Sequence, residues 1–203
     1  MKQLSILPIV EGVGEDKSIR QLLQRIWQEL LGEEYVDVRK AIRKHRTQLV
    51  LRDHLTATVD LAARKLKNRP AYGDSLILLL LDSDGDPPCE LGPKLLGWMR
   101  DETEFPVACV LAHHEFETWF VAAAESLTQY LDLAQGDTPV DNPEADRAKK
   151  RWIRRRFRGV KYNESIHQPR LTQAMDLGLA RARCSSFDKL CRELEACRDL
   201  AEN

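Results

Sequence analysis

Apolar runs alternate with amphipathic segments along the chain up to residue 128. The clearest run is Leu76 to Leu81, six aliphatic residues that predict a strand buried on both faces, as in a parallel sheet. Weaker runs predict further strands at residues 4–10, 35–42 and 107–112. Helical spacing of apolar residues follows each strand, and strands that alternate with helices are typical of α/β proteins. We therefore expect a doubly wound, parallel, four-stranded sheet with helices on both faces.

Proline and glycine mark one predicted loop inside this pattern. The group Pro87, Pro88, Gly92 and Pro93 follows the central strand and predicts a loop. A helix of about ten residues is expected to follow the loop and to reach Arg100.

The pattern changes after residue 128. A polar, proline-bearing stretch at 134–146 predicts a loop, and the next residues predict a basic helix that ends at Gly159. Two more helices are expected, one at about 170–182 after Pro169 and one from Ser186 to Leu200. We therefore expect an α/β domain and a helical C-terminal extension packed on it, at residues 1–128 and 129–203.

Composition limits the class of protein. The chain has 203 residues, 43% hydrophobic and 31% charged, which is typical of a globular protein and excludes a disordered one. The five cysteines form no Cys-x-x-Cys pair, which argues against a disulfide framework or a zinc ribbon. The N-terminus has no cleavable signal pattern, and no apolar run is long enough to cross a membrane. We expect a cytoplasmic protein with no membrane segment.

Acidic residues follow three of the predicted strands. Parallel strands end at a common edge of the sheet, where α/β proteins bind their ligands. Carboxylates gathered there would repel one another unless a cation held them, and oxygen ligands suit Mg²⁺ or Mn²⁺. We therefore expect a divalent-metal site at this edge. The residues that follow the three strands are Glu11, Glu15, Asp82, Asp84, Asp86, His113, Glu115 and Glu117.

The same motifs allow other interpretations besides a metal site. The Asp-x-Asp motif after the central strand could be an acidic turn that only ends the strand. An EF-hand is excluded because Pro87 and Pro93 stand where that loop needs glycine and glutamate. The glycines after the first strand lack the spacing of a nucleotide-binding loop. Four aliphatic residues before Asp-x-Asp-Gly also resemble the nucleophile motif of haloacid-dehalogenase-type (HAD-like) phosphatases, a distant alternative because that motif belongs on the first strand.

The order of two short motifs resembles the TOPRIM domain of topoisomerases, primases and overcoming-lysogenization-defect (OLD) nucleases. The motifs are Ile9-Val10-Glu11-Gly12 at the end of the first strand and Leu81-Asp82-Ser83-Asp84 at the end of the central strand. The second acid of Glu11-Gly-x-Gly-Glu15 is most similar to the nuclease branch. The resemblance covers about residues 3–127.

The full chain also resembles a bacterial family of TOPRIM-like proteins known as domain of unknown function 4276. The similar segments include Glu115-Phe-Glu-Thr-Trp-Phe120 and Gln168-Pro-x-Leu-Thr172. This resemblance implies a metal-dependent nuclease, in phage defence and beside an ATPase partner. His113 and His114 depart from the family pattern, so their role stays open between metal ligation and hydrogen bonding to the acids.

The chemistry of the acids suggests a role for each in such a nuclease. Asp82 and Asp84 would ligate Mg²⁺ or Mn²⁺, and Glu11 would ligate the ion or act as general base. Glu15 and Glu117 would complete a second metal position, as in two-metal phosphodiesterases. The expected catalytic residues are thus Glu11, Asp82 and Asp84, and the expected metal ligands are Glu11, Glu15, Asp82, Asp84 and Glu117.

The segment 147–161 is strongly basic and contains interleaved aromatic residues, whereas the whole chain has a net charge of −1. A solvated helix face is the simplest interpretation, but segregated charge of this kind favours a phosphate-binding stripe. The expected nucleic-acid-binding residues are Lys150, Arg151, Arg154, Arg155, Arg158 and Lys161. The same stripe supports a second hypothesis, a non-catalytic module that binds nucleic acid or an ATPase and regulates it.

Overall fold

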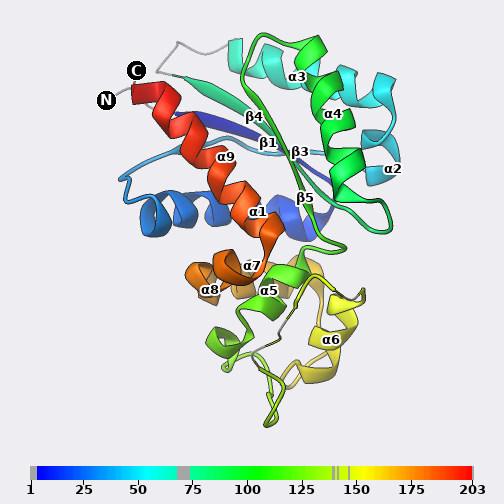
Figure 1. Ribbon diagram of the computed structural model, residues 1–203, viewed down its shortest axis with the longest axis vertical. Helices are drawn as coiled ribbons and strands as arrows, with labels where there is room; N and C mark the ends of the chain where they lie inside the picture. Colours follow the sequence, from blue (N-terminus) through cyan, green and yellow to red (C-terminus); the bar gives the residue numbers. More distant parts are fainter. Residues whose placement is uncertain (1–3, 68–73, 139, 141, 146, 203) are drawn as a thin grey trace.

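A parallel sheet forms the centre of the molecule (Figure 1). The computed structural model describes residues 4–67, 74–138, 140, 142–145 and 147–202. Within these residues the sheet has five parallel strands in the order β2-β1-β4-β5, and β3 also pairs with β1. The strands are β1 (Ser5–Val10), β2 (Asp37–Val38), β3 (Ile42–Arg43), β4 (Ser75–Asp82) and β5 (Val107–Ala112).

The three apolar strands lie where the sequence predicts them, and the parallel α/β class is confirmed. The strand expected at 35–42 is wrong in detail, because the structure has two short strands on either side of residues 39–41. Charged Arg39 and Lys40 interrupt the apolar pattern there, and the ladder with β1 breaks after the Arg39 N–H, which still donates to Ile6 O. The sheet therefore has five strands among the described residues, not four.

Helices cover both faces of the sheet (Figure 1). One face packs against α3 (Arg52–Lys67) and α4 (Pro88–Glu102), through residues such as Val59 and Leu95. The other face packs against α1 (Val13–Arg25) and α9 (Ser185–Glu202), through residues such as Leu22 and Leu190. The final helix thus supplies part of this covering layer, beside β5.

Most of the remaining helices gather below the sheet in the view of Figure 1. They share the core of the α1–α9 face, to which Phe120, Ile153 and Leu171 all belong. The predicted boundary between residues 128 and 129 therefore lies within one continuous apolar core, and the division into two units stays a prediction. These elements are α5 (Glu117–Ala122), the 3₁₀ turn η2 (Ala124–Leu127), α6 (Lys149–Arg156), α7 (Glu164–Ala174) and α8 (Leu177–Arg183).

Two helices start earlier than the sequence predicts, because each contains a proline that was expected to precede it. Helix α4 begins at Pro88 and contains Pro93, and α7 contains Pro169, so neither starts after its prolines. Proline is tolerated in the first turn of a helix because backbone N–H groups there have no partner within the helix. At a later position proline costs the helix one hydrogen bond. The helix expected at 170–182 is instead two helices, separated where Asp176 caps the start of α8. The basic helix ends at Arg156, before Gly159.

Two short elements complete the chain. A π-helical turn, η1 (Ile26–Leu30), extends α1, and α2 (Arg46–Leu49) follows β3. No helix in the described ranges combines the length and the apolar character needed to cross a membrane.

Candidate functional site

The ends of β1 and β4 define the site. Chain order reverses between these neighbouring strands, because β2 and β5 lie on opposite sides of them, and ligands of open α/β sheets bind at such switch points. Glu11 directly follows β1, and Asp82 is the last residue of β4. The backbone N–H of Asp82 donates to Glu11 Oε1 at 2.9 Å. The structure thus brings these two acids together.

Two glycines let a third acid and a glutamine approach this edge. Helix α1 begins at Val13, so Gly12 is its N-cap residue. A Cβ on Gly12 would lie 1.9 Å from Glu15 Oε2, and a Cβ on Gly14 would lie 1.6 Å from Gln168 Oε1. Gln168, from α7, donates from Nε2 to Glu15 Oε1 at 3.2 Å. The glycines therefore permit close packing of buried side chains, which explains their place in a motif that is not a phosphate-binding loop.

Glu117 supplies the fourth acid, from the start of α5. Its side chain is buried, with a relative exposure of 1%. Tyr162 donates its hydroxyl to Glu117 Oε1 at 2.9 Å, whereas Glu117 Oε2 has no hydrogen-bond partner in the structure. The amide oxygen of Gln168 is also buried without a partner. Unpaired buried acceptors are costly, and they are typical of positions that bind a cation or a donor.

The shifted pKa values report that these acids share one environment. Burial raises the pKa of Asp82 well above its usual value, and the charges of Glu11 and Glu117 raise it further. Burial also raises the pKa of Glu11, against the effect of the Asp82 N–H, and Glu15 adds to the rise. Burial raises the pKa of Glu117 to about 7 despite the opposing effect of Lys150. We call Glu11, Glu15, Asp82 and Glu117 the inner acids.

Lys150 is a cation that acts on two of the inner acids, Asp82 and Glu117. Its Nζ lies 3.3 Å from Glu164 Oε1. Burial alone would lower the pKa of Lys150, but the carboxylates of Glu117, Glu164 and Asp82 hold it above its usual range. A single lysine thus partly offsets several buried carboxylates.

The other two acids of the β4 turn point to a different cation. Asp84, with a φ of 49°, and Asp86 are exposed, and we call them the outer acids. Arg46 Nε lies 3.4 Å from Asp84 Oδ2, and its Nη2 contacts Asp86 Oδ2. Arg46 also donates to the backbone oxygens of Asp82 and Ser83, at 2.9 and 3.1 Å. The Asp-x-Asp motif therefore sends one carboxylate inward and the other toward Arg46.

The residues after β5 hold loops together. His114, with a φ of 64°, donates from its ring Nδ1 to Asp84 O at 3.0 Å, and its backbone N–H donates to Ser83 Oγ. His113 stacks on His114 at 4.3 Å and lies 4.0 Å from Glu144. Glu115 Oε2 accepts from the backbone N–H of Lys150, in the first turn of α6. In this structure the histidines thus contact backbone and Glu144, not the inner acids.

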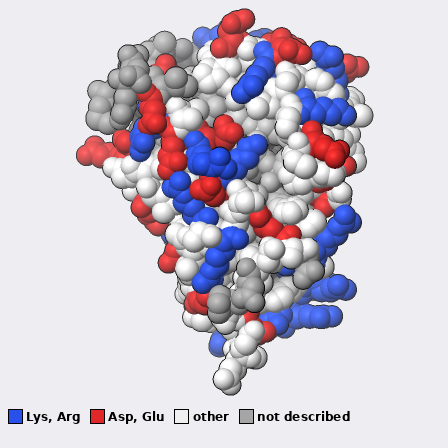
Figure 2. Space-filling view, in the orientation of Figure 1, with Lys and Arg blue, Asp and Glu red and all other residues white. Residues whose placement is uncertain are grey.

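The predicted basic stripe divides into paired and unpaired residues. Lys150 and Arg154 both reach Glu164, and Arg158 reaches Asp132. Among the described residues, no acid lies within ion-pair distance of the remaining members. Figure 2 shows lysine and arginine side chains projecting over α6 at the lower right. The unpaired, exposed members are Arg151, Arg155 and Lys161.

Three residues of this region were not singled out from the sequence. Gln168 and Tyr162 come from the C-terminal half, and their contacts with Glu15 and Glu117 span more than forty residues of chain. Arg46 stood in a basic run without a role of its own. The similarity of the Gln168-Pro segment to the family pattern was the available signal for Gln168; no local pattern marks Tyr162 or Arg46.

The donor chemistry of the inner acids fits a hard divalent cation, since the charges of Glu11, Glu15 and Glu117 all act on Asp82 and one oxygen of Glu117 is free. In the described part of the chain, no three His, Cys, Asp or Glu side chains already surround one point at ligating distance. The carboxylates of Glu11 and Asp82 instead accept backbone N–H groups, the latter from Phe116 at 2.8 Å.

Comparison with known proteins gives a family. A family model described as a domain of unknown function (DUF4276) matches residues 10–195, which include every inner and outer acid and the basic helix. No curated protein and no solved structure gives a significant match. Because the match spans most of the sequence, the chain belongs to the DUF4276 family.

Proposed function

We propose that this protein is a TOPRIM-type nuclease that hydrolyses phosphodiester bonds of DNA or RNA with Mg²⁺ or Mn²⁺. The observation that carries the proposal is the meeting of Glu11 and Asp82 at the switch point, with the charges of Glu15 and Glu117 close enough to raise the pKa of Asp82. Buried carboxylates that repel one another are destabilising without a cation, and such groups concentrate at functional sites.

The inner acids would hold the metal. Asp84 would join them by exchanging its ion pair with Arg46 for the ion. When bound, the metal would act as a Lewis acid on the phosphodiester and on a nucleophilic water. Burial raises the pKa of Glu11, which makes it a stronger base than an exposed glutamate and suits a general base.

Lys150 would serve the substrate. It faces Asp82, Glu117 and Glu164, so its ammonium group can balance negative charge on a phosphate beside the inner acids. Tyr162 would keep Glu117 in place through its hydroxyl. The resemblance also suggests an ATPase as the partner protein in phage defence.

The test is metal-dependent cleavage. Purified protein should cut single- or double-stranded DNA or RNA with Mg²⁺ or Mn²⁺ and not with EDTA. Asp82→Asn should lower the rate by about 100-fold or more, because it removes a buried charge at the reacting centre. Asp101→Asn, an exposed acid on α4, is the matched control and should cut normally. Equal cleavage by Asp82→Asn would assign the activity to a contaminant.

A second candidate is a non-catalytic module that binds nucleic acid or an ATPase. The absence of a preformed three-ligand group in the described residues and the Arg46–Asp84 ion pair favour it. Salt-dependent nucleic-acid binding that survives loss of Asp82 and Asp84, with no cleavage under either metal, would select this candidate.

A further inference from the structure

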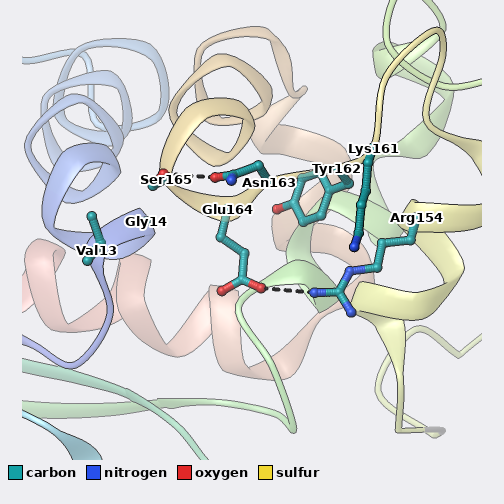
Figure 3. A pocket seen from close by; sticks show the side chains of 8 residues that line it. All are labelled: Val13, Gly14, Arg154, Lys161, Tyr162, Asn163, Glu164 and Ser165. Carbon is teal, nitrogen blue, oxygen red and sulfur yellow. Dashed lines mark hydrogen bonds and ion pairs between the residues drawn. The ribbon is translucent and has the colours of Figure 1, made fainter.

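A pocket of about 530 Å³ opens beside the inner acids, between the first turns of α1 and α7 and the side of α6 (Figure 3). Figure 3 shows Val13 and Gly14 on one side of it, and Lys161 and Arg154 on the other, with Glu164 between them. Tyr162 also lines the pocket, and its hydroxyl contacts Glu117. The pocket thus lies one side chain away from the proposed reaction centre.

Positive charge predominates around the pocket. Lys161 has no ion-pair partner among the described residues, and Arg154 Nη2 is 3.4 Å from Glu164 Oε1. Lys150 approaches the same carboxylate from the side of the inner acids. Lys17 of α1 donates to Ser165 O at the start of α7 and brings a fourth cation close. Glu164 is the one acid among the residues that line the pocket, and its carboxylate is already paired with Arg154 and Lys150.

The backbone adds to this preference. Residues 13–14 and 164–165 are the first residues of two helices, whose N–H groups lack partners within the helix. Helix starts favour anions, and here they support the charges of Arg154 and Lys161. Exposed Arg151 and Arg155 continue the positive charge along α6, so a long polyanion meets more cations than a small one does.

From these features we infer that the pocket binds a backbone phosphate of a nucleic-acid strand, next to the phosphate held at the inner acids. This inference rests on the proposed function for the neighbouring reaction, but it concerns binding alone. Lys161 and Arg154 contact the phosphate, and Glu164 weakens its binding by repulsion. The strand then runs from the inner acids, past Tyr162, and out over α6.

Binding without metal tests the inference. Fluorescence anisotropy in EDTA would follow labelled single-stranded DNA and RNA of about 12 nucleotides. Lys161→Ala and Arg154→Ala should each weaken binding about five- to tenfold and reduce the slope of log K against log salt by about one. Glu164→Gln should tighten binding about threefold or more, because it removes a repelling charge. Lys65→Ala, an exposed lysine on α3, is the matched control and should bind normally.

The opposite signs separate a charge effect from damage to the fold, which thermal unfolding of each variant checks. Unchanged binding by Lys161→Ala and Arg154→Ala, or weaker binding by Glu164→Gln, would overturn the inference. A mononucleotide whose affinity is within about twofold of that of the strand would also overturn the inference, since it would identify a pocket for small phosphate esters. Strand binding that depends on Lys161 without any cleavage would sustain the inference and reject the nuclease. Metal-dependent cleavage together with strand binding that is unchanged in Lys161→Ala would sustain the nuclease and overturn the inference.

Discussion

Two groups of carboxylates lie around the end of β4, and they are neutralised in different ways. The outer acids, Asp84 and Asp86, share one arginine at the surface. The inner acids are buried or half-buried, and two cations oppose their charge only in part, since Lys150 is shared with Glu164 and Arg46 with the outer acids. Residues two positions apart in one motif therefore have opposite electrostatic situations.

The difference between the two groups shows that the fold retains unfavourable charge at the inner acids. An arginine that pairs with exposed carboxylates stabilises a turn, whereas buried carboxylates in mutual contact lower stability unless something binds them. Such a pocket of unbalanced charge is more consistent with a binding role than with a structural one. The predictions below separate the two groups, from the largest expected effect to the smallest.

Metal binding should stabilise the protein through the inner acids. At a Mg²⁺ or Mn²⁺ concentration of 100 times the Kd, the free energy of unfolding should rise by about 2.7 kcal/mol. Asp82→Asn should abolish this gain, while Asp86→Asn should keep it. In EDTA, Asp82→Asn should be at least as stable as the wild type, because the amide oxygen still accepts from Phe116 N–H. Chemical denaturation with and without metal measures all three.

If metal raises the free energy of unfolding of Asp82→Asn as much as that of the wild type, the ion binds somewhere other than the inner acids. If the metal-induced rise in the free energy of unfolding is lost only in Asp86→Asn, the outer acids bind the metal and the inner acids do not.

The inner acids should also make metal-free stability depend on pH. Glu117 has a pKa of about 7 in the folded protein, against 4.5 as the ordinary value. Below the ordinary value both states are protonated, so this group has no effect. Between the two values only the unfolded chain loses the proton, so the free energy of unfolding falls as pH rises and stays low above pH 7.

Glu117→Gln removes this dependence and keeps an acceptor for Tyr162. In EDTA at pH 8 the variant should be more stable than the wild type by roughly 2–3 kcal/mol, and at pH 4 the two should be equal. Thermal and urea unfolding at several pH values measure the difference. A variant less stable than the wild type at pH 8 would mean that Lys150 fully balances the carboxylate.

Arg46 should matter to stability but less than the inner charges do. Arg46→Ala removes two backbone hydrogen bonds and two ion pairs, and it should lower the free energy of unfolding by about 1–2 kcal/mol. Arg52→Ala is the matched control, since its pair with Asp101 is exposed on both sides, and it should change stability by less than about 0.5 kcal/mol. If the two variants are equal, Arg46 is not holding the β4 turn.

The strands that carry the site could be predicted because their signal is local. Six buried aliphatic residues in β4 and a similar run in β5 have no other stable environment, and acids at their ends follow from the chain order. The β2–β3 edge was less predictable because two charged residues interrupt a weak pattern. Proline inside α4 and α7 was misleading because packing outweighs one lost hydrogen bond.

The environment of each acid could not be predicted from spacing. The spacing of Asp82 and Asp84 does not reveal that Asp84 takes a left-handed conformation and turns toward Arg46. That conformation goes with a contact from a distant loop, in which the Asp84 N–H donates to His114 O. Gln168 reaches Glu15 through the packing of α7 on α1, and Tyr162 reaches Glu117 from the residues just before α7. Such contacts join distant segments, and a single sequence carries little information about them.

The position of α9 has a consequence for synthesis of the protein. Phe187, Leu190 and Leu194 cover the side of β5 that carries Ala108 and Val110. A nascent chain that has already made β5 must therefore wait for residues 185–202 to leave the ribosome before that face is shielded from water. During this interval the exposed aliphatic surface is a natural target for chaperones, and slow translation of the intervening segment would lengthen the exposure.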